Sequence, residues 1–407
     1  MLKAVKMRLY PNKEQAQYFA VTFGCVRWVY NEALAYCNAH YEANKDLPED
    51  QREKRPTAYD LQKRVTQLKK DEGKEWLKDA DSQALKYACA SIDQAFKNFF
   101  RRVKNGETPG FPRFKSKFRG DATFTSTQIC VIKLNDEYVK IPKAGDVRQR
   151  GGKLPEGAKV KRVTVRRTPT GKFYATVLID DGQELPAQPT ENLDPVGVDV
   201  GCKTEGYTQQ FAALSTGEII NTDATYKRLQ KRLAREQRRL ARKVKGSNNR
   251  IKQKKRLARV HEKIGFIRQN TLHQITNRLT LSHESIAVET LNIKGMMAKP
   301  KPKEDPERPG VFLPNNAKSK AGLSRSLASV SLGEFFRQLE YKCAWRGVGL
   351  IKIDQWAPSS KTCSGCGYLN KDLTLSVRAW TCPSCGADHH RDINAAKNIA
   401  KMAIAKM

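Results

Sequence analysis

Four cysteines in two closely spaced pairs form the clearest chemical pattern in the sequence. The pairs are Cys363-Ser-Gly-Cys366 and Cys382-Pro-Ser-Cys385, and a glycine follows each pair. Each Cys-x-x-Cys turn presents two thiolates to one side, and two such turns complete a tetrahedral shell around Zn²⁺. Because four cysteine ligands leave no coordination position for water, the spacing predicts one structural zinc ion in a zinc ribbon.

Three acidic residues at the ends of predicted elements could bind a second kind of metal. Asp199 interrupts the apolar segment Val-Gly-Val-Asp-Val-Gly, Glu289 ends the segment Ser-Ile-Ala-Val-Glu, and Asp392 begins the last predicted helix. Buried strands rarely hold an unpaired carboxylate, so we expect a cation to face these side chains. Mg²⁺ prefers oxygen ligands and accepts phosphate oxygens in its shell. The three acids together predict a phosphodiesterase that binds two magnesium ions.

The reaction expected of such a site is hydrolysis of a phosphodiester bond. One ion lowers the pKa of an attacking water, and the other stabilises the leaving 3′ oxygen of an in-line displacement. No covalent intermediate is needed. Each acid taken alone is more often a surface or helix-cap residue, so the prediction depends on all three.

The order of elements in the C-terminal half would bring these acids together. Paired strands, a basic helical hairpin, a strand, a helix, a further strand and a final helix follow one another, as in an RNase H-like fold. In that fold the first and fourth strands lie side by side. We therefore expect Asp199 and Glu289 on neighbouring strands, with Asp392 beside them. The predicted elements span residues 196–220, 226–263, 285–289, 333–345, 348–353 and 391–405.

The N-terminal half divides into a helical and a strand-rich region. Residues 1–10 alternate polar and apolar side chains like a strand, and helical periodicity continues from there to about residue 102. The aromatic and basic segment 109–118 suits a nucleic-acid backbone or an ordinary exposed loop equally well. Short strands then predict a small β-barrel, so the fold class is α+β with several domains. These strands are expected at 128–132, 138–141, 160–167 and 173–179.

The charge of the chain indicates a polyanionic partner. Lys and Arg number 75 against 42 Asp and Glu, which gives a formal net charge of +33, far more than solubility requires. The segment 226–263 is strongly basic, with an apolar seam at helical spacing. The sequence contains neither a membrane-spanning apolar run nor a signal peptide. It therefore favours nucleic acid over a membrane, and a location inside the cell, in the cytoplasm.

Six further cysteines stand singly among apolar neighbours. We expect them to be reduced residues of the core, as isolated intracellular cysteines usually are. They are Cys25, Cys37, Cys89, Cys130, Cys202 and Cys343.

Motifs along nearly the whole chain resemble those of the TnpB family, the transposon-encoded relatives of type V CRISPR effectors. In the first half these motifs are Arg8-Leu-Tyr-Pro11, Arg27-Trp-Val-Tyr-Asn31, Ala95-Phe-Lys-Asn-Phe-Phe100 and Gly110-Phe-Pro-Arg-Phe114. In the second half they are Gly197-Val-Asp-Val-Gly201, Val288-Glu-Thr-Leu291 with Met296, Glu334–Lys342, Pro358–Gly367, and Arg378–Cys382 leading to Arg391–Ile399.

The resemblance implies a helical recognition domain inserted into a wedge β-barrel, followed by a RuvC-like nuclease interrupted by the zinc ribbon. It also implies guide-RNA-directed cleavage of double-stranded DNA beside a short adjacent motif, with catalytic acids at Asp199, Glu289 and Asp392. Arg378 in the ribbon is then expected either to touch the scissile phosphate or to form a structural salt bridge. The expected boundaries are 1–10 and 121–190 for the wedge, 11–120 for recognition, 191–357 and 389–407 for the nuclease, and 358–388 for the ribbon.

Two segments depart from the family pattern. Residues 203–210 lengthen what is usually a compact hairpin, and residues 298–325 enlarge a loop where relatives keep a short lid. The second segment is rich in Lys, Pro, Asn and Ser and is expected to be a mobile loop. These departures leave open whether the guide RNA comes from a transposon end or from a CRISPR array.

Other functions would use some of the same features. A non-catalytic RNA- or DNA-binding zinc-ribbon protein would share the charge and the cysteines, but it would not need three acids at element ends. Acid-triad DNA transposases usually place their glutamate last, whereas Glu289 lies between two aspartates. Relaxase-like transposases need a His-x-His pair, whereas His389 and His390 are adjacent and are expected to make local polar contacts. The sequence therefore favours the RNA-guided nuclease.

Overall fold

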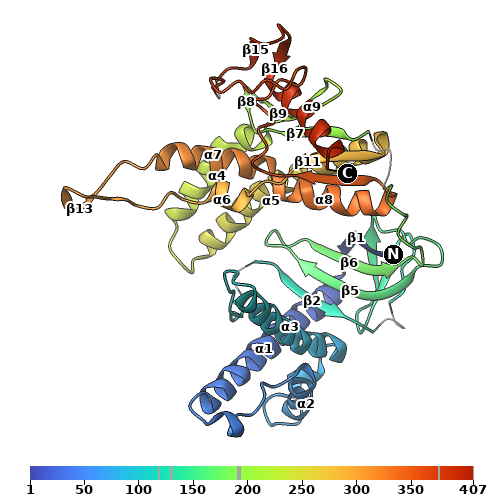
Figure 1. Cartoon of the computed structure of the whole chain (residues 1–407). Coiled ribbons are helices and arrows are strands. Elements are labelled where there is room, and N and C mark those ends of the chain that lie inside the picture. The colour runs from blue at the N-terminus through green and yellow to red at the C-terminus, as the bar shows by residue number, and fades with distance from the viewer. Residues whose placement is uncertain (118–119, 129–131, 190–193, 375, 407) are drawn as a thin grey trace. The chain divides into compact units, whose positions relative to one another are not determined.

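The chain of 407 residues folds into two compact units, Met1–Glu184 and Leu185–Met407, each with its own sheet (Figure 1). The computed structural model describes residues 1–117, 120–128, 132–189, 194–374 and 376–406. The predicted strand at 128–132, with Cys130, falls largely outside the described residues.

The first unit combines an antiparallel sheet with three long helices. Its strand order is β2-β5-β6-β1-β4-β3, so β1 pairs with strands that come much later in the chain. Strands β2 and β4 are additions to the predicted set. No pairing joins β2 to β3 among the described residues, and closure into a barrel stays a prediction. The elements are β1 Leu2–Tyr10, α1 Lys13–Asn44, α2 Ala58–Leu68, α3 Ser82–Lys104, β2 Ala122–Ser126, β3 Tyr138–Ile141, β4 Gly145–Arg150, β5 Lys159–Arg167 and β6 Phe173–Asp180, with short 3₁₀ turns at Glu49–Gln51 and Glu75–Lys78.

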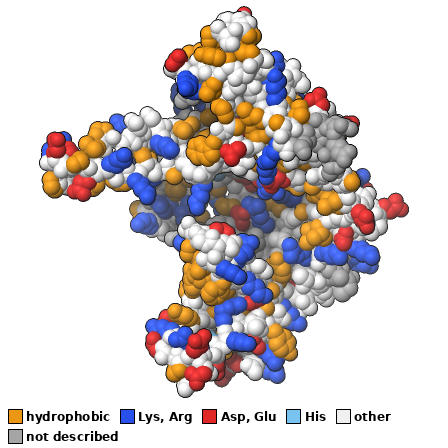
Figure 2. All heavy atoms as spheres, viewed as in Figure 1, with side chains coloured by type: hydrophobic (Ala, Val, Ile, Leu, Met, Phe, Trp, Pro, Cys, Tyr) orange, Lys and Arg blue, Asp and Glu red, His pale blue; other side chains and the backbone are white. Residues whose placement is uncertain are grey.

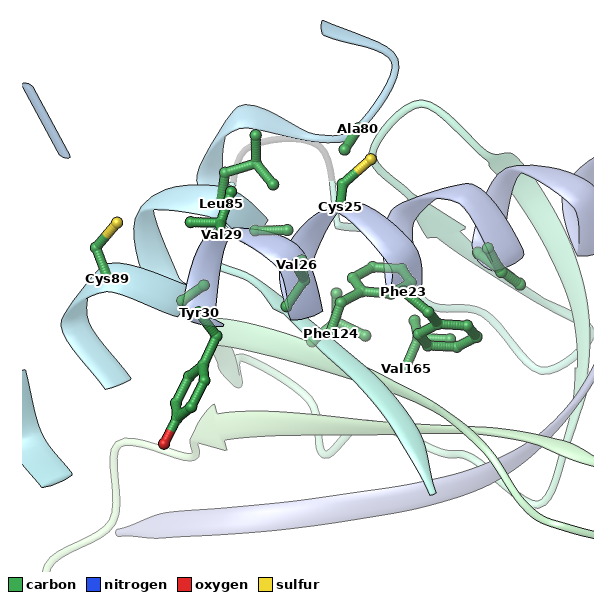
Figure 3. Close-up of a cluster of buried hydrophobic side chains, with 14 of the residues drawn as sticks. Phe23, Cys25, Val26, Val29, Tyr30, Ala80, Leu85, Cys89, Phe124 and Val165 are labelled. Atoms are coloured by element: carbon green, nitrogen blue, oxygen red, sulfur yellow. The ribbon is translucent and has the colours of Figure 1, made fainter. Parts of the chain in front are cut away.

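Helix α1 joins this sheet to the other helices through an apolar core. The ring of Phe23 lies 5.4 Å from that of Phe124 on β2. Figure 3 shows α1 side chains such as Val26 between Leu85 of α3 and the sheet residues Phe124 and Val165. Burying these side chains contributes roughly 1.5–3 kcal/mol each. The apolar stripe of α1 is therefore structural, as its helical spacing predicts.

The described cysteines outside the two pairs agree with the prediction of reduced core residues. Cys25, Cys37, Cys89 and Cys343 are buried, Cys202 is half-buried, and all five are free thiols.

The second unit is built on a mixed sheet in which β10, β9 and β7 are antiparallel and β7, β11 and β14 are parallel. The order is β10-β9-β7-β11-β14, and the short β8 pairs with β9. The strands that carry Asp199 and Glu289, β7 and β11, are neighbours, as predicted. The strands are β7 Val196–Val200, β8 Thr204–Glu205, β9 Thr208–Leu214, β10 Ile219–Asp223, β11 Ser285–Glu289 and β14 Gly349–Ile353.

Helices enclose this sheet. The basic hairpin predicted at 226–263 corresponds to α4 and the first half of α5, which continues to Ser282. Its seam of Leu233, Val260 and Ile264 is buried. Gln253 of α5 donates a 2.7 Å hydrogen bond to Glu236 of α4, which satisfies two buried polar side chains at once. The helices are α4 Thr225–Ala241, α5 Asn248–Ser282, α6 Ile293–Met297, α7 Ala317–Val330, α8 Leu332–Arg346 and α9 Arg391–Ile404.

The prediction of a loop at residues 298–325 is wrong for much of the segment, which contains regular elements. A short hairpin, β12 Glu304–Asp305 and β13 Arg308–Phe312, is followed directly by α7. Leu327 and Val330 at the end of α7 are buried in the core of the unit. These apolar residues lie just beyond the polar segment, so its composition concealed the helix that they anchor.

The surface of the protein reflects its basic composition. Lys and Arg side chains are spread over both units on the face seen in Figure 2. In the part of the chain that the structure describes, every helix is too short or too polar to cross a membrane.

Candidate active site

Asp199 and Glu289 lie level with each other on neighbouring parallel strands. Val288 of β11 pairs with Val198 of β7, so the next position on each strand carries an acid. Val198 and Val288 point into the core formed with α5 and α8. Because side chains alternate between the two faces of a sheet, both carboxylates point to the opposite face.

Helix α9 covers that opposite face at unusually close range. A Cβ atom at Gly197 would lie 1.9 Å from the carbonyl oxygen of Ala396, so only glycine lets the strand and the helix meet. Ile399 of α9 packs on Ala287 of β11 in the small core beneath the helix. Asp392 lies in the first turn of α9, which brings the third predicted acid to the ends of the two strands.

The electrostatics of the acids show that they are close enough to interact. Burial, and then the negative charges of Glu289 and Asp392, raise the pKa of Asp199 to about 8. Burial also raises the pKa of Glu289, although a hydrogen bond from Ser359 opposes this. Glu289 and Asp392 disfavour the charged form of Asp199, which a bound cation would favour. The carboxylate oxygens are ligands of the kind that a hard divalent ion such as Mg²⁺ prefers.

Polar neighbours orient two of the acids. The Ser359 hydroxyl donates a 2.7 Å hydrogen bond to Glu289 Oε1, and the Gln210 side chain donates one of 2.8 Å to Asp392 Oδ2. Ser359 and Gln210 were not predicted as site residues. Ser359 lies in the sequence motif Pro358–Gly367. No sequence pattern around Gln210 indicates its role, because its partner is 182 residues away.

Arg378 contacts Asp392 directly. Its guanidinium Nη1 lies 3.0 Å from Asp392 Oδ1, which is one of the two roles expected for this arginine. The backbone N–H of Arg391 also donates to the Arg378 carbonyl oxygen, at 2.8 Å. The strand that begins directly after Arg378, β15 Ala379–Thr381, is thus tied to the start of α9.

Two buried asparagines of α9 hold the chain where it leaves β14. Asn398 Nδ2 donates to the Ser359 carbonyl oxygen at 2.8 Å, and Asn394 Nδ2 donates to the Thr362 carbonyl oxygen at 2.7 Å. The backbone N–H of Ser364 donates back to Asn394 Oδ1 at 2.8 Å. These contacts fix Ser359, and with it the hydrogen bond to Glu289.

The four predicted zinc ligands form one cluster. Their Sγ atoms all lie within 4.8 Å of one another, with Cys363 to Cys385 and Cys366 to Cys382 both at 3.7 Å. Tetrahedral bonds of about 2.3 Å to Zn²⁺ require sulfur atoms about 3.8 Å apart. The cluster therefore fits zinc.

The ribbon strands β15 Ala379–Thr381 and β16 Asp388–His390 pair beside this cluster. His389 Nε2 lies 3.0 Å from Cys363 Sγ, and its ring lies 4.8 Å from that of Trp380. The expectation of local polar contacts holds for His389.

Known proteins match the chain along its full length. A protein of Streptomyces pristinaespiralis is 34% identical over 406 residues, which cover 99% of this chain and 90% of that protein. InsQ of Escherichia coli (strain K12) is 33% identical over 399 residues, which cover 98% of this chain and 91% of InsQ. The names of both describe RNA-guided DNA endonucleases. The chain belongs to the TnpB family.

Three family models match parts of this TnpB chain. They are "Helix-turn-helix domain" at residues 1–46, "Probable transposase" at 176–299 and "Cas12f1-like, TNB domain" at 333–399. The first name implies two helices, whereas the TnpB chain has one strand, β1, and one long helix, α1, in this range. The third match spans both the cysteine pairs and Asp392.

A solved structure shares the fold of this TnpB chain. The alignment with the protein chain of a Cas12f1–sgRNA–target DNA complex covers 98% of this chain and 98% of that chain, with a TM-score of 0.53 and 14% sequence identity. At that identity the likeness concerns the fold alone, and it places the TnpB chain among compact mixed α and β proteins.

Proposed function

We propose that this TnpB-family protein is an RNA-guided DNA endonuclease whose catalytic residues are Asp199, Glu289 and Asp392. The observation that carries the proposal is that β7, β11 and the first turn of α9 bring three acids far apart in the sequence to one face of one sheet. There burial, and then the charges of Glu289 and Asp392, raise the pKa of Asp199. The names of the relatives from Streptomyces and Escherichia support RNA guidance and DNA as the substrate.

The strand order of the second unit supports a RuvC-like nuclease. In the order β10-β9-β7-β11-β14, the first and fourth strands of the unit's five main strands lie side by side, as expected for an RNase H-like fold. Within this proposal the zinc ribbon is an insert between β14 and α9, and the six-stranded sheet and helices of the first unit are the wedge and recognition domains. The boundaries are those expected from the sequence.

The carboxylate oxygens of Asp199, Glu289 and Asp392 are the ligands we propose for two magnesium ions. Bound there, such ions would supply an activated water and stabilise the leaving 3′ oxygen. Ser359 and Gln210 keep the carboxylates of Glu289 and Asp392 in fixed orientations. Arg378 balances the charge of Asp392, and we propose that it turns to the scissile phosphate when ions occupy the site.

The partners that fit this assignment are a guide RNA and double-stranded target DNA with a short adjacent motif. The net charge of +33 suits long polyanions, and the basic hairpin α4–α5 offers a continuous surface for phosphates. We place the protein at the prokaryotic nucleoid, where its DNA substrate is.

The test is magnesium-dependent cleavage of DNA matched to the RNA that co-purifies with the protein. Sequencing that RNA identifies the guide and shows whether it derives from a transposon end or a CRISPR array. Asp199→Asn and Glu289→Gln should each slow cleavage by about a thousandfold or more, equivalent to about 4 kcal/mol. RNA binding should be retained in both variants.

Glu218→Gln is the matched control. Glu218 belongs to the same unit, but it is half-exposed in a surface ion pair with Arg278 at 2.8 Å, so cleavage should be unchanged. Wild-type cleavage by Asp199→Asn would refute the proposed site.

A further inference from the structure

Trp356 differs from the other four tryptophans of the chain. It is 82% exposed, and among the residues that the structure describes it has no aromatic neighbour. The other four each lie against a ring: Trp28 and Trp76 against each other, Trp345 against Tyr341, and Trp380 against His389. A fully exposed indole leaves a large flat apolar surface in water, which is characteristic of a binding residue when it stands beside a site.

Trp356 lies in the turn between Ile353 and Ser359, and both ends of this turn lie beside Glu289. The turn starts after Ile353, which is level with Glu289 in the β11–β14 pairing, and whose carbonyl oxygen accepts from the Thr290 N–H at 3.0 Å. It ends at Ser359, whose hydroxyl donates to Glu289. Trp356 is therefore held close to a proposed catalytic acid.

The turn itself is fixed. The backbone N–H of Trp356 donates a 2.7 Å hydrogen bond to Asp354 Oδ1. Next to it lies an open depression of about 400 Å³, lined by the ends of β11 and β14 and by Gln355. Thr290 and Asn292 contribute polar groups to its wall. Trp356 follows Gln355 directly in the chain, and an exposed ring next to the wall of a partly polar depression suits a ligand with an aromatic face and polar edges.

We propose that Trp356 stacks against an unpaired nucleobase of the DNA strand that enters the active site. This inference rests on the proposed nuclease function, because that function brings a DNA strand to Glu289. Any base can stack on an indole, so the contact holds the strand regardless of its sequence. The strongly basic chain favours this occupant over a protein partner, which would not need so large a positive charge.

The experiment measures binding of an oligodeoxythymidylate to the full chain carrying Asp199→Asn, which prevents cleavage. Two readouts are followed at raised salt, where phosphate contacts weaken: the anisotropy of the labelled oligonucleotide and the tryptophan emission of the protein. In the parent, binding should quench part of that emission. Trp356→Phe should remove most of the quenching and keep the affinity within about threefold, since a phenyl ring still stacks.

Trp356→Leu separates stacking from simple apolar contact. It should weaken binding by about 5- to 100-fold, the loss typical of one base–aromatic stack. Unchanged zinc content and melting temperature would show that each variant is folded. Trp76→Phe is the control, because Trp76 is 38% exposed but lies in the first unit against Trp28, and it should leave both readouts unchanged.

Parent-like affinity of Trp356→Leu, or parent-like quenching in Trp356→Phe, would overturn the proposal. Both results would be expected if this turn docks a protein instead. Failure of this proposal and failure of the nuclease assignment can be told apart: a chain that fails to cleave DNA could still show the Trp356 effects, and an active nuclease could lack them.

Discussion

The carbonyl oxygen of Ala396 on α9 occupies the space that a Cβ atom would need at Gly197 on β7, only 1.9 Å from it. Strand and helix therefore meet backbone to backbone. Asp392 begins the same helix, and Asp199 lies two residues beyond Gly197 on the same face of β7. The close approach is what places these acids within electrostatic reach of each other.

Gly197→Ala should destabilise the second unit by about 1–3 kcal/mol or more, because the opposing atoms belong to the helix backbone and cannot rotate away. Urea denaturation followed by circular dichroism would measure the loss. Gly265→Ala is the control: Gly265 lies inside α5, a Cβ there meets no atom within 4 Å, and alanine should add up to about 1 kcal/mol. Equal effects at the two positions would contradict the packing described.

Without divalent ions, the second unit should lose stability as the pH rises from about 4 to about 8. The pKa of Asp199 is raised from 3.8 to about 8, so in this range the unfolded chain has released a proton that the folded chain retains. Each pH unit then lowers stability by at most about 1.4 kcal/mol. Asp199→Asn should flatten the plot of melting temperature against pH. An equally steep plot for this variant would assign the dependence to other groups.

Cys382→Ser should abolish zinc binding and unfold the ribbon while leaving the core of the second unit folded. The four thiolates act as one site, so loss of one ligand leaves an incomplete tetrahedral shell. Elemental analysis should give one zinc ion per wild-type chain and none in the variant. Cys202→Ser should keep its zinc, because Cys202 is a half-buried thiol outside the cluster. A zinc-free wild-type protein would disprove the ribbon site.

Arg378→Ala should lower the maximal rate of cleavage by about 100-fold, as expected for loss of one donor to a phosphate in the transition state. It should also lower the magnesium concentration needed for half-maximal rate, because the arginine no longer competes for Asp392. A magnesium titration of the cleavage rate measures both. If Arg378→Ala cleaved DNA at the wild-type rate at saturating magnesium, Arg378 would have no role beyond its ion pair with Asp392. Arg337→Ala, which breaks a pair with Glu334 on the exposed side of α8, should change neither value.

The three acids could be predicted because the alternation of side chains along a strand and the order of the elements can both be read directly from the sequence. Val196–Val200 and Ser285–Glu289 are short apolar strands, and each carries one carboxylate in an unfavourable setting. The adjacency of these strands followed from the order of the elements around them. The spacing of the cysteines likewise predicted a single four-cysteine site, and the four sulfur atoms do lie together.

The groups that orient the acids could not be predicted in the same way. Gln210 and Ser359 donate hydrogen bonds to residues 182 and 70 positions away. The periodicity of the sequence does not predict a hydrogen bond between residues so far apart. The helix α7 was missed for a different reason. Its first two turns are polar, and it is stabilised by Leu327 and Val330 at its end, outside the segment whose composition suggested a loop.

The two ends of the zinc ribbon bear on any attempt to build chimeras from TnpB relatives. The chain leaves the core of the second unit at Ser359, which donates to Glu289, and returns to it at Asp392, which Arg378 contacts from within the intervening segment. A graft that replaced this whole segment would also replace groups that orient two of the proposed catalytic carboxylates. The part open to exchange lies inside residues 365–390 and must keep an arginine at position 378 and the cysteines at positions 366, 382 and 385.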